Sequence, residues 1–171
     1  MDILKEHIRD IPDFPKKGIV FKDITPVLRS PQAFAAAVDG LVDAVATHEF
    51  DLICGIESRG FLFGAAMAYR LGRGFIPVRK PGKLPYRTIQ ESYALEYGTN
   101  TVEIHEDAVD PGQRVLVVDD LLATGGTAEA TGKLIRRLGG VVAAYLFVVE
   151  LSFLNGRPRF QDAPVLSLVQ Y

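Results

Sequence analysis

The chain has little of what several large classes of protein require. Only one of its 171 residues is cysteine, so an internal disulfide is excluded, and Cys54 lies in an apolar run typical of a buried, inert thiol. The 21 acidic and 19 basic residues give a net charge of −2 and no general attraction to nucleic acid or to anionic lipid. No apolar stretch approaches membrane-spanning length, and the charged stretch from Met1 to His7 is unlike a signal peptide. These absences predict a cytoplasmic protein in which any phosphate binding is local.

Several common catalytic motifs are also missing. The sequence contains no P-loop, no Gly-x-Gly-x-x-Gly fingerprint and no His-Glu-x-x-His zinc motif. Ser58 does not fit a serine hydrolase, because Ile56 stands where the nucleophile elbow requires glycine. Hydrolysis by these routes is therefore not predicted.

What is present indicates one α/β domain spanning residues 1–171. Hydrophobic residues make up 48% of the chain, which is enough for one sizeable core. Short apolar runs predict buried strands, and apolar residues at helical spacing between them predict helices. We expect a mostly parallel, twisted sheet flanked by helices, with strands at 52–56, 75–78, 115–118, 141–149 and 165–169, and with helices beginning at 31, 61 and just after 127.

Two segments fall outside this pattern. Residues 1–28 hold a short charged helix followed by Pro12, Pro15, Gly18 and Pro26, which predict an irregular cap that we call the hood. Residues 79–105 fit no packed helix and predict a long, mobile hairpin that acts as a lid, with arms at 93–97 and 101–105.

The most informative segment joins the strand at 115–118 to two acids, Asp119 and Asp120. If the strand ends at Val118, the chain turns, and both carboxylates can face one ligand such as the paired hydroxyls of a ribose. The alternatives are a solvated acidic turn or a bare Mg²⁺ site. The second is disfavoured, because two carboxylates hold Mg²⁺ weakly unless substrate oxygens complete the shell.

Small and hydroxyl-bearing residues follow these acids and lead into a helix. Such a loop lets backbone N–H groups approach a phosphate closely, and the positive end of the helix favours the same anion. The predicted phosphate loop consists of Ala123, Thr124, Gly125, Gly126 and Thr127.

Two further groups of residues suit a second anion. Ser58, Arg59 and Gly60 lie between a predicted strand and a helix and offer N–H groups and a cation that fit a pyrophosphate; a tight turn with Glu57 and Arg59 paired is the alternative. Residues 79–87, which we call the cationic loop, contain four cations and no acid, as a second anion-binding segment would require. The alternative interpretation is a run of solvated surface charges. The cations of this loop are Arg79, Lys80, Lys83 and Arg87.

The run from Arg114 to Thr127 resembles the phosphoribosyl diphosphate (PRPP) signature of the type I phosphoribosyltransferases. The resemblance implies that fold, and it implies that Asp119 and Asp120 bind the ribose hydroxyls while residues 123–127 bind the 5′-phosphate. Residues 8–24, 55–61, 79–85 and 93–98 resemble, in the same order, further blocks of the adenine phosphoribosyltransferases. The resemblance therefore covers nearly the whole chain.

This resemblance implies transfer of the phosphoribosyl group from PRPP to N9 of adenine, giving AMP and pyrophosphate. It implies Mg²⁺ held mainly by PRPP oxygens, with no protein side chain assigned as a ligand, and a homodimer. Pyrophosphate would be bound by the residues at two loops, namely Ser58, Arg59, Gly60, Arg79, Lys80 and Lys83.

The resemblance also assigns residues to the base. Glu96 would be the general acid or base on the purine, whereas the residue considered without the resemblance is better explained as a surface glutamate. Val20 and Phe21 would contact the flat ring, with backbone groups of Val20 reading its edge; a plain core role suits Phe21 as well. The family commonly has arginine where this chain has Lys22, a change that a backbone contact would survive.

Two other functions remain open. A xanthine or guanine phosphoribosyltransferase would differ in how the hood reads the base edge. A regulator that binds PRPP or nucleotides without turnover would need a DNA-binding segment or a strongly basic face, and the sequence shows neither.

Overall fold

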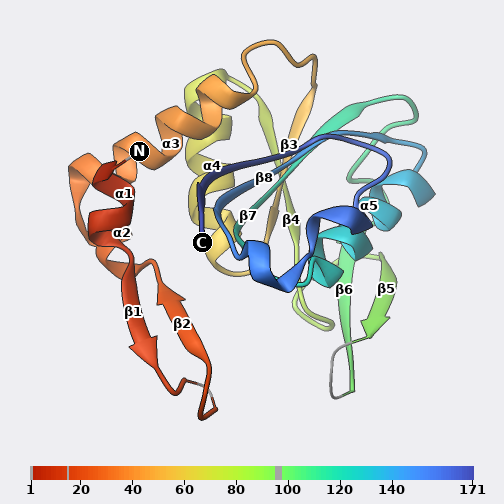
Figure 1. Ribbon diagram of the computed structural model, residues 1–171. Coiled ribbons are helices and arrows are strands. Elements are labelled where there is room, and N and C mark those ends of the chain that lie inside the picture. Colours follow the sequence, from red (N-terminus) through yellow and green to blue (C-terminus); the bar gives the residue numbers. More distant parts are fainter. Residues whose placement is uncertain (1, 15, 95–97) are drawn as a thin grey trace.

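A five-stranded sheet organises the chain, and each neighbouring pair of its strands is parallel (Figure 1). The structure is a computed structural model that describes residues 2–14, 16–94 and 98–171. The strand order is β4-β3-β7-β8-β9, so the predicted parallel sheet is confirmed. The strands are β3 (Leu52–Ile56), β4 (Gly74–Val78), β7 (Arg114–Leu122), β8 (Val141–Glu150) and β9 (Val165–Gln170).

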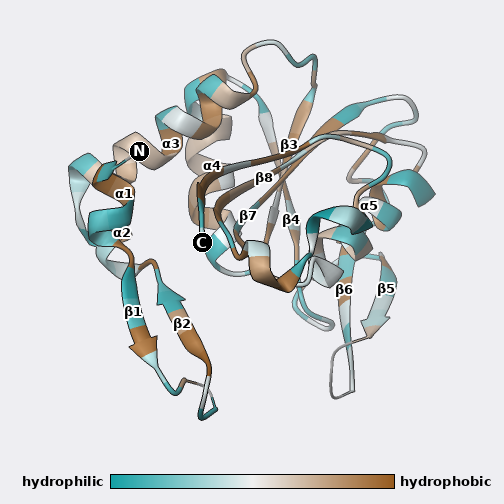
Figure 2. Ribbon diagram, viewed as in Figure 1, coloured by the Kyte–Doolittle hydropathy of each residue, from teal (hydrophilic) through white to brown (hydrophobic). Residues whose placement is uncertain are grey.

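Helices cover both faces of this sheet. Helices α3 (Pro31–Ala44) and α4 (Arg59–Leu71) lie on one face, and α5 (Gly126–Arg137) lies on the other (Figure 1). Strand alternation divides the apolar residues of β7, so that Leu116 and Val118 join the core beneath α3 and α4 while Val115 and Val117 join the core beneath α5. The central strands are accordingly apolar along most of their length (Figure 2).

The predicted helix starts are close to those observed. Ser30 caps α3, because its Oγ accepts the Ala33 N–H at 3.2 Å and Pro31 occupies the first turn. Helix α4 begins at Arg59, two residues before the predicted start at 61. None of the helices in the described part of the chain is long and apolar enough to cross a membrane.

The hood contains a short hairpin that extends away from the sheet (Figure 1). Its elements are α1 (Asp2–His7), β1 (Arg9–Pro12), β2 (Val20–Asp23) and α2 (Thr25–Arg29), and β1 pairs antiparallel with β2. Helix α2 was not predicted. Pro26 lies in its first turn, where the missing N–H would have no helical partner, so this proline begins a helix instead of interrupting one.

A second hairpin packs against α5 and pairs β5 (Thr88–Ala94) with β6 (Thr99–His105) in antiparallel register. The predicted first arm at 93–97 was wrong in its start, because the strand begins at Thr88; residues 95–97 lie outside the described residues. The early part of β5 is polar, but Thr88 Oγ1 and Gln90 Nε2 donate to the buried Glu103 carboxylate on β6 at 3.3 and 3.1 Å. These bonds stabilise a strand that apolar periodicity does not reveal.

Candidate active site

The carboxyl ends of β3, β4 and β7 surround a cavity of about 640 Å³. Parallel α/β sheets bind ligands at this edge, because loops and helix N-termini converge there. The cavity brings together eight of the residues that the sequence predicts for binding of the ribose, the 5′-phosphate and pyrophosphate: Ser58, Arg59, Arg79, Lys80, Lys83, Asp119, Asp120 and Thr127.

The two acids are part of β7 and do not follow it. Strand β7 continues to Leu122, with Asp119 opposite Phe147 and Leu121 opposite Val149 on β8, so the expected chain turn after Val118 is wrong. Pairing with a long neighbouring strand outweighs the low strand propensity of aspartate. Both acids nevertheless line the cavity, and Asp120 is only 5% exposed, which rules out a solvated acidic turn.

The two carboxylates have different surroundings. Asp120 Oδ2 lies 2.5 Å from Arg59 Nε, an ion pair that neutralises its charge. Asp119 Oδ1 accepts the Asp120 backbone N–H at 2.9 Å. Burial, together with the neighbouring Asp120 carboxylate, raises the pKa of Asp119 above its ordinary value. Asp119 is thus the acid of the pair that has more to gain from a new hydrogen-bond donor.

The phosphate loop, residues 123–127, borders a smaller cavity of about 80 Å³ that Asp119 and Tyr93 also line. Gly125 has a φ of +84° and precedes α5, which begins at Gly126. The N–H groups in the first turn of a helix have no intrahelical acceptor, so they are available to an anion here. The β5–β6 hairpin also reaches this smaller cavity, where Thr127 Oγ1 donates a hydrogen bond to the Tyr93 hydroxyl at 2.8 Å.

The loop between β3 and α4 lies directly against β7. A side chain at Gly60 would place its Cβ 2.7 Å from the Val118 carbonyl oxygen and 2.9 Å from Asp119 Oδ1. Only glycine allows this approach of the loop to the acid pair. The alternative pairing of Glu57 with Arg59 is wrong, because Arg59 binds Asp120 and Glu57 binds the cationic loop.

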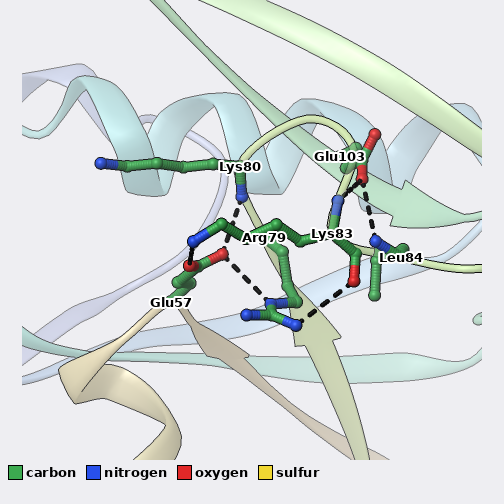
Figure 3. Close-up of polar contacts among 6 residues, drawn as sticks. All are labelled: Glu57, Arg79, Lys80, Lys83, Leu84 and Glu103. Atoms are coloured by element: carbon green, nitrogen blue, oxygen red, sulfur yellow. Dashed lines mark hydrogen bonds and ion pairs between the residues drawn. The ribbon is translucent and has the colours of Figure 1, made fainter.

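Figure 3 shows how Glu57 binds that loop. Its Oε1 lies 2.7 Å from Lys83 Nζ, and its Oε2 accepts Arg79 Nε at 3.2 Å and the Lys80 backbone N–H at 2.9 Å. Two of the four cations, Arg79 and Lys83, are therefore not simply solvated. Burial alone would raise the pKa of Glu57, but the hydrogen bonds from Lys83, Lys80 and Arg79 lower it to about 2.

This lowered pKa predicts an acid-dependent contribution to stability. An acid whose pKa falls on folding stabilises the fold above its unfolded pKa, about 4.5 here, and loses that contribution as the pH falls toward 2. Glu57→Gln should therefore lower the free energy of unfolding at neutral pH and lower it less at about pH 3. Urea unfolding at both pH values measures this. The exposed Glu49→Gln is the control, and a Glu57→Gln deficit that is equal at both pH values would contradict the prediction.

The hood residues predicted to bind the base lie close to this edge at one point. The Arg59 guanidinium carbon lies 5.9 Å from the centroid of the Phe21 ring, which itself packs edge-on against Phe14. Phe21 belongs to neither core cluster, and Val20 is 46% exposed. Lys22 Nζ pairs with Asp10 at 2.6 Å and lies 3.8 Å from the centroid of the Tyr171 ring, so its ammonium group is engaged within the fold.

Some site features were not found in the sequence. Glu57 and Tyr93 were missed as site residues, because only the tertiary fold brings them to the two predicted anion-binding loops. The position of Tyr93 within the predicted lid was the one available signal. Glu96 lies outside the described residues. Within the described ranges, no three His, Cys, Asp or Glu side chains gather as a metal site, so Mg²⁺ fits beside Asp119 and Asp120 only if substrate oxygens supply most of its ligands.

Comparisons with known proteins agree with this arrangement. A family model described as a phosphoribosyl transferase domain matches residues 25–158. The adenine phosphoribosyltransferase of Thermotoga neapolitana is 59% identical over 168 residues, covering 98% of this chain and 99% of the relative. The crystal structure of the Thermoanaerobacter pseudethanolicus enzyme of that name has a TM-score of 0.97 at 56% identity, covering 99% of both chains.

A third similar protein was solved with ligands. The adenine phosphoribosyltransferase of Saccharomyces cerevisiae, complexed with adenine and an imino-altritol bisphosphate, has a TM-score of 0.91 at 43% identity and covers 98% of this chain and 97% of its own. Sequence, fold and site lead to the same assignment: the chain belongs to the phosphoribosyltransferases, and within them to the adenine phosphoribosyltransferase family.

Proposed function

We propose that the protein transfers the 5-phosphoribosyl group of PRPP to N9 of adenine, with release of pyrophosphate and of the N9 proton and formation of AMP. The observation that carries this proposal is a pair of adjoining cavities at the sheet edge. One is lined by several cations and by both carboxylates, and the other is lined by Asp119 and the phosphate loop. A related structure that contains adenine supports the choice of base.

Each part of PRPP has a proposed binding group. Residues 123–127 bind the 5′-phosphate through backbone N–H groups, and Asp119 and Asp120 accept hydrogen bonds from the ribose hydroxyls. The diphosphate is bound by the loop at Ser58, Arg59 and Gly60 and by the side chains of the cationic loop. As the bond from C1′ to diphosphate breaks, positive charge develops on the sugar, and the acid pair stabilises it electrostatically.

The base is bound by the hood at Val20, Phe21 and Lys22. Because Lys22 Nζ is paired with Asp10, its contribution to the base would come from the backbone. Glu96 is the proposed general acid or base that handles the imidazole proton while N9 attacks C1′. Closure of the hairpin as a mobile lid would exclude water from the reacting carbon.

Three further properties belong to the same proposal. Mg²⁺ would enter with PRPP, next to Asp119 and Asp120, and would neutralise charge on the departing diphosphate. The protein would act as a homodimer, and it would act in the cytoplasm. Sedimentation of the purified chain tests the dimer.

The direct test is AMP formation from adenine, PRPP and Mg²⁺, with guanine, xanthine and hypoxanthine as competing bases. We expect adenine to be converted at least about 100-fold more efficiently than the others, because a site that hydrogen-bonds the exocyclic amine leaves polar groups unpaired with an oxo-purine. Preference for guanine or xanthine would identify the alternative transferases. PRPP binding without turnover of any base would identify a regulator.

A further inference from the structure

Three of the donors that are proposed to bind diphosphate already bind a carboxylate of the protein itself. Arg79 Nε, Lys83 Nζ and the Lys80 backbone N–H all donate to the Glu57 carboxylate, at 3.2, 2.7 and 2.9 Å (Figure 3). Glu57 follows β3, its side chain is only 9% exposed, and it lines the same cavity as its three donors. A carboxylate offers two oxygens to forked donors much as a phosphate does. Glu57 thus occupies the position of an internal anion in this subsite.

A second carboxylate holds the backbone of the same loop. Glu103 on β6 is 2% exposed, and its Oε1 accepts the Lys83 and Leu84 backbone N–H groups, each at 3.3 Å. Among the described residues, no ion pair joins the Glu103 carboxylate to the Arg79 guanidinium or to the Lys83 ammonium group, the two cationic side chains that Glu57 binds. Glu103 therefore holds the backbone at Lys83 and Leu84, whereas Glu57 holds the two charged side chains and the Lys80 N–H. Arg79 and Lys83 can exchange partners by side-chain rotation while Glu103 keeps the backbone at 83 and 84 in place.

The charges of the cavity show what such an exchange would involve. Arg59 pairs with Asp120, and Arg79 and Lys83 pair with Glu57, whereas the Lys80 ammonium has no acid partner within the described part of the chain. An arriving diphosphate meets one uncommitted ammonium and two cations that it must share with, or take from, Glu57. Like charges at short range repel more strongly in a partly dehydrated site than in open water.

We propose that Glu57 is a positioning residue that holds Arg79 and Lys83 in place in the empty site and competes with the diphosphate for them, so that pyrophosphate is released more readily after transfer. This inference deepens the proposed function and rests on it. After transfer, Glu57 takes back the two cations as the product leaves. No bond is formed or broken by Glu57, and the exchange is one of ion pairs only.

The test is calorimetric binding of pyrophosphate with Mg²⁺ to the full chain, comparing wild type with Glu57→Gln. Glutamine keeps the shape and removes the charge, so we expect the Kd of pyrophosphate to fall about tenfold. The inhibition constant of pyrophosphate in AMP formation should fall by the same factor. A purely structural role for Glu57 predicts the opposite, because a loosened loop binds the product more weakly. Unchanged or weaker binding overturns the proposal.

Two variants make the result specific. Glu103→Gln removes the same charge nearby but loosens the loop backbone, so pyrophosphate should bind more weakly; tightening equal to that of Glu57→Gln would overturn the proposal, because any lost negative charge would then suffice. If Glu57→Gln does not fold, Glu57→Asp replaces it. Its shorter carboxylate cannot keep all three contacts, and the Kd should fall about threefold; an unchanged or higher Kd overturns the proposal.

The wild type separates this inference from the proposed function. If the wild type neither forms AMP nor binds pyrophosphate in competition with PRPP, the proposed function fails, and the inference fails with it. If the wild type does both and Glu57→Gln binds pyrophosphate no more tightly, the inference alone fails.

Discussion

Glu96→Gln is expected to lower kcat for AMP formation by about 10²- to 10⁴-fold, the usual range for loss of a general acid or base. A glutamine amide neither accepts nor releases a proton as an acid or base near neutral pH. N9 of adenine, however, must lose its proton as the bond to C1′ forms. The KM for PRPP should change little, because other residues are proposed to bind PRPP. Steady-state kinetics over a range of pH measures both effects, and the variant should lose the limb of the kcat profile that belongs to the carboxyl group.

Glu91→Gln is the matched control for this prediction. Glu91 lies on β5 of the same hairpin, undergoes the same change of charge, and pairs with Arg137 on α5 at 3.2 Å, away from the cavity lining. Its kcat should stay within about twofold of wild type, since surface ion pairs contribute little. If Glu96→Gln retained wild-type kcat as well, Glu96 would be a plain surface glutamate and the proton would have another acceptor.

Asp119→Asn is expected to lower kcat/KM for PRPP by about 10- to 100-fold and at the same time to raise the melting temperature. A hydrogen bond to a charged acceptor is worth about 1.5 to 3 kcal/mol, and the ribose would lose that difference. In the protein without PRPP, the same substitution is expected to be favourable and to stabilise the fold. The raised pKa of Asp119 means that its ionised form costs stability at neutral pH, and asparagine removes this charge next to Asp120 while its carbonyl can still accept the Asp120 N–H.

The opposite signs of these two effects make the prediction specific. Thermal unfolding and PRPP titration of one preparation measure both. Asp39→Asn, at an exposed ion pair with Arg70 at 3.1 Å, is the control and should change neither quantity. A lower melting temperature for Asp119→Asn would mean that Asp119 is a structural acid, and unchanged kinetics would mean that the ribose is bound elsewhere.

The sheet could be predicted from the sequence because its strands are continuous apolar runs. Strands buried on both faces need no polar alternation, so 52–56 and 141–149 were recognisable from composition alone. The end of β7 was not, because its last residues are kept in the sheet by the neighbouring β8 and not by their own propensity. Likewise, Thr88 and Gln90 are part of a strand because of a buried carboxylate on its partner.

The residues of the candidate site likewise fall into two groups, those that local sequence predicts and those that only the fold reveals. The acid pair and the phosphate loop are contiguous in sequence, so their chemistry was visible in one segment. The partner of the cationic loop was not, because Glu57 lies 22 residues before Arg79 and 26 before Lys83, and nothing in local spacing indicates that contact. Tyr93 was missed for the same reason, since it meets Thr127 across 34 residues. Local patterns predicted which loops would bind ligands, and the fold was needed to show which side chains these loops contact within the protein.

The backbone contact between Gly60 and β7 has a consequence for which sugar donors can react. Strands β3 and β7 are direct neighbours in the sheet, with Gly55 opposite Val118, and adjacent strands lie about 4.8 Å apart. If the loop at 58–60 binds the leaving group and the acid pair binds the sugar, as proposed, the distance between these two binding groups is set by main-chain packing. A donor with a six-membered ring, or with one more atom before its leaving group, would satisfy one binding group and miss the other. The protein would then distinguish sugar donors of different length without any side chain dedicated to that purpose.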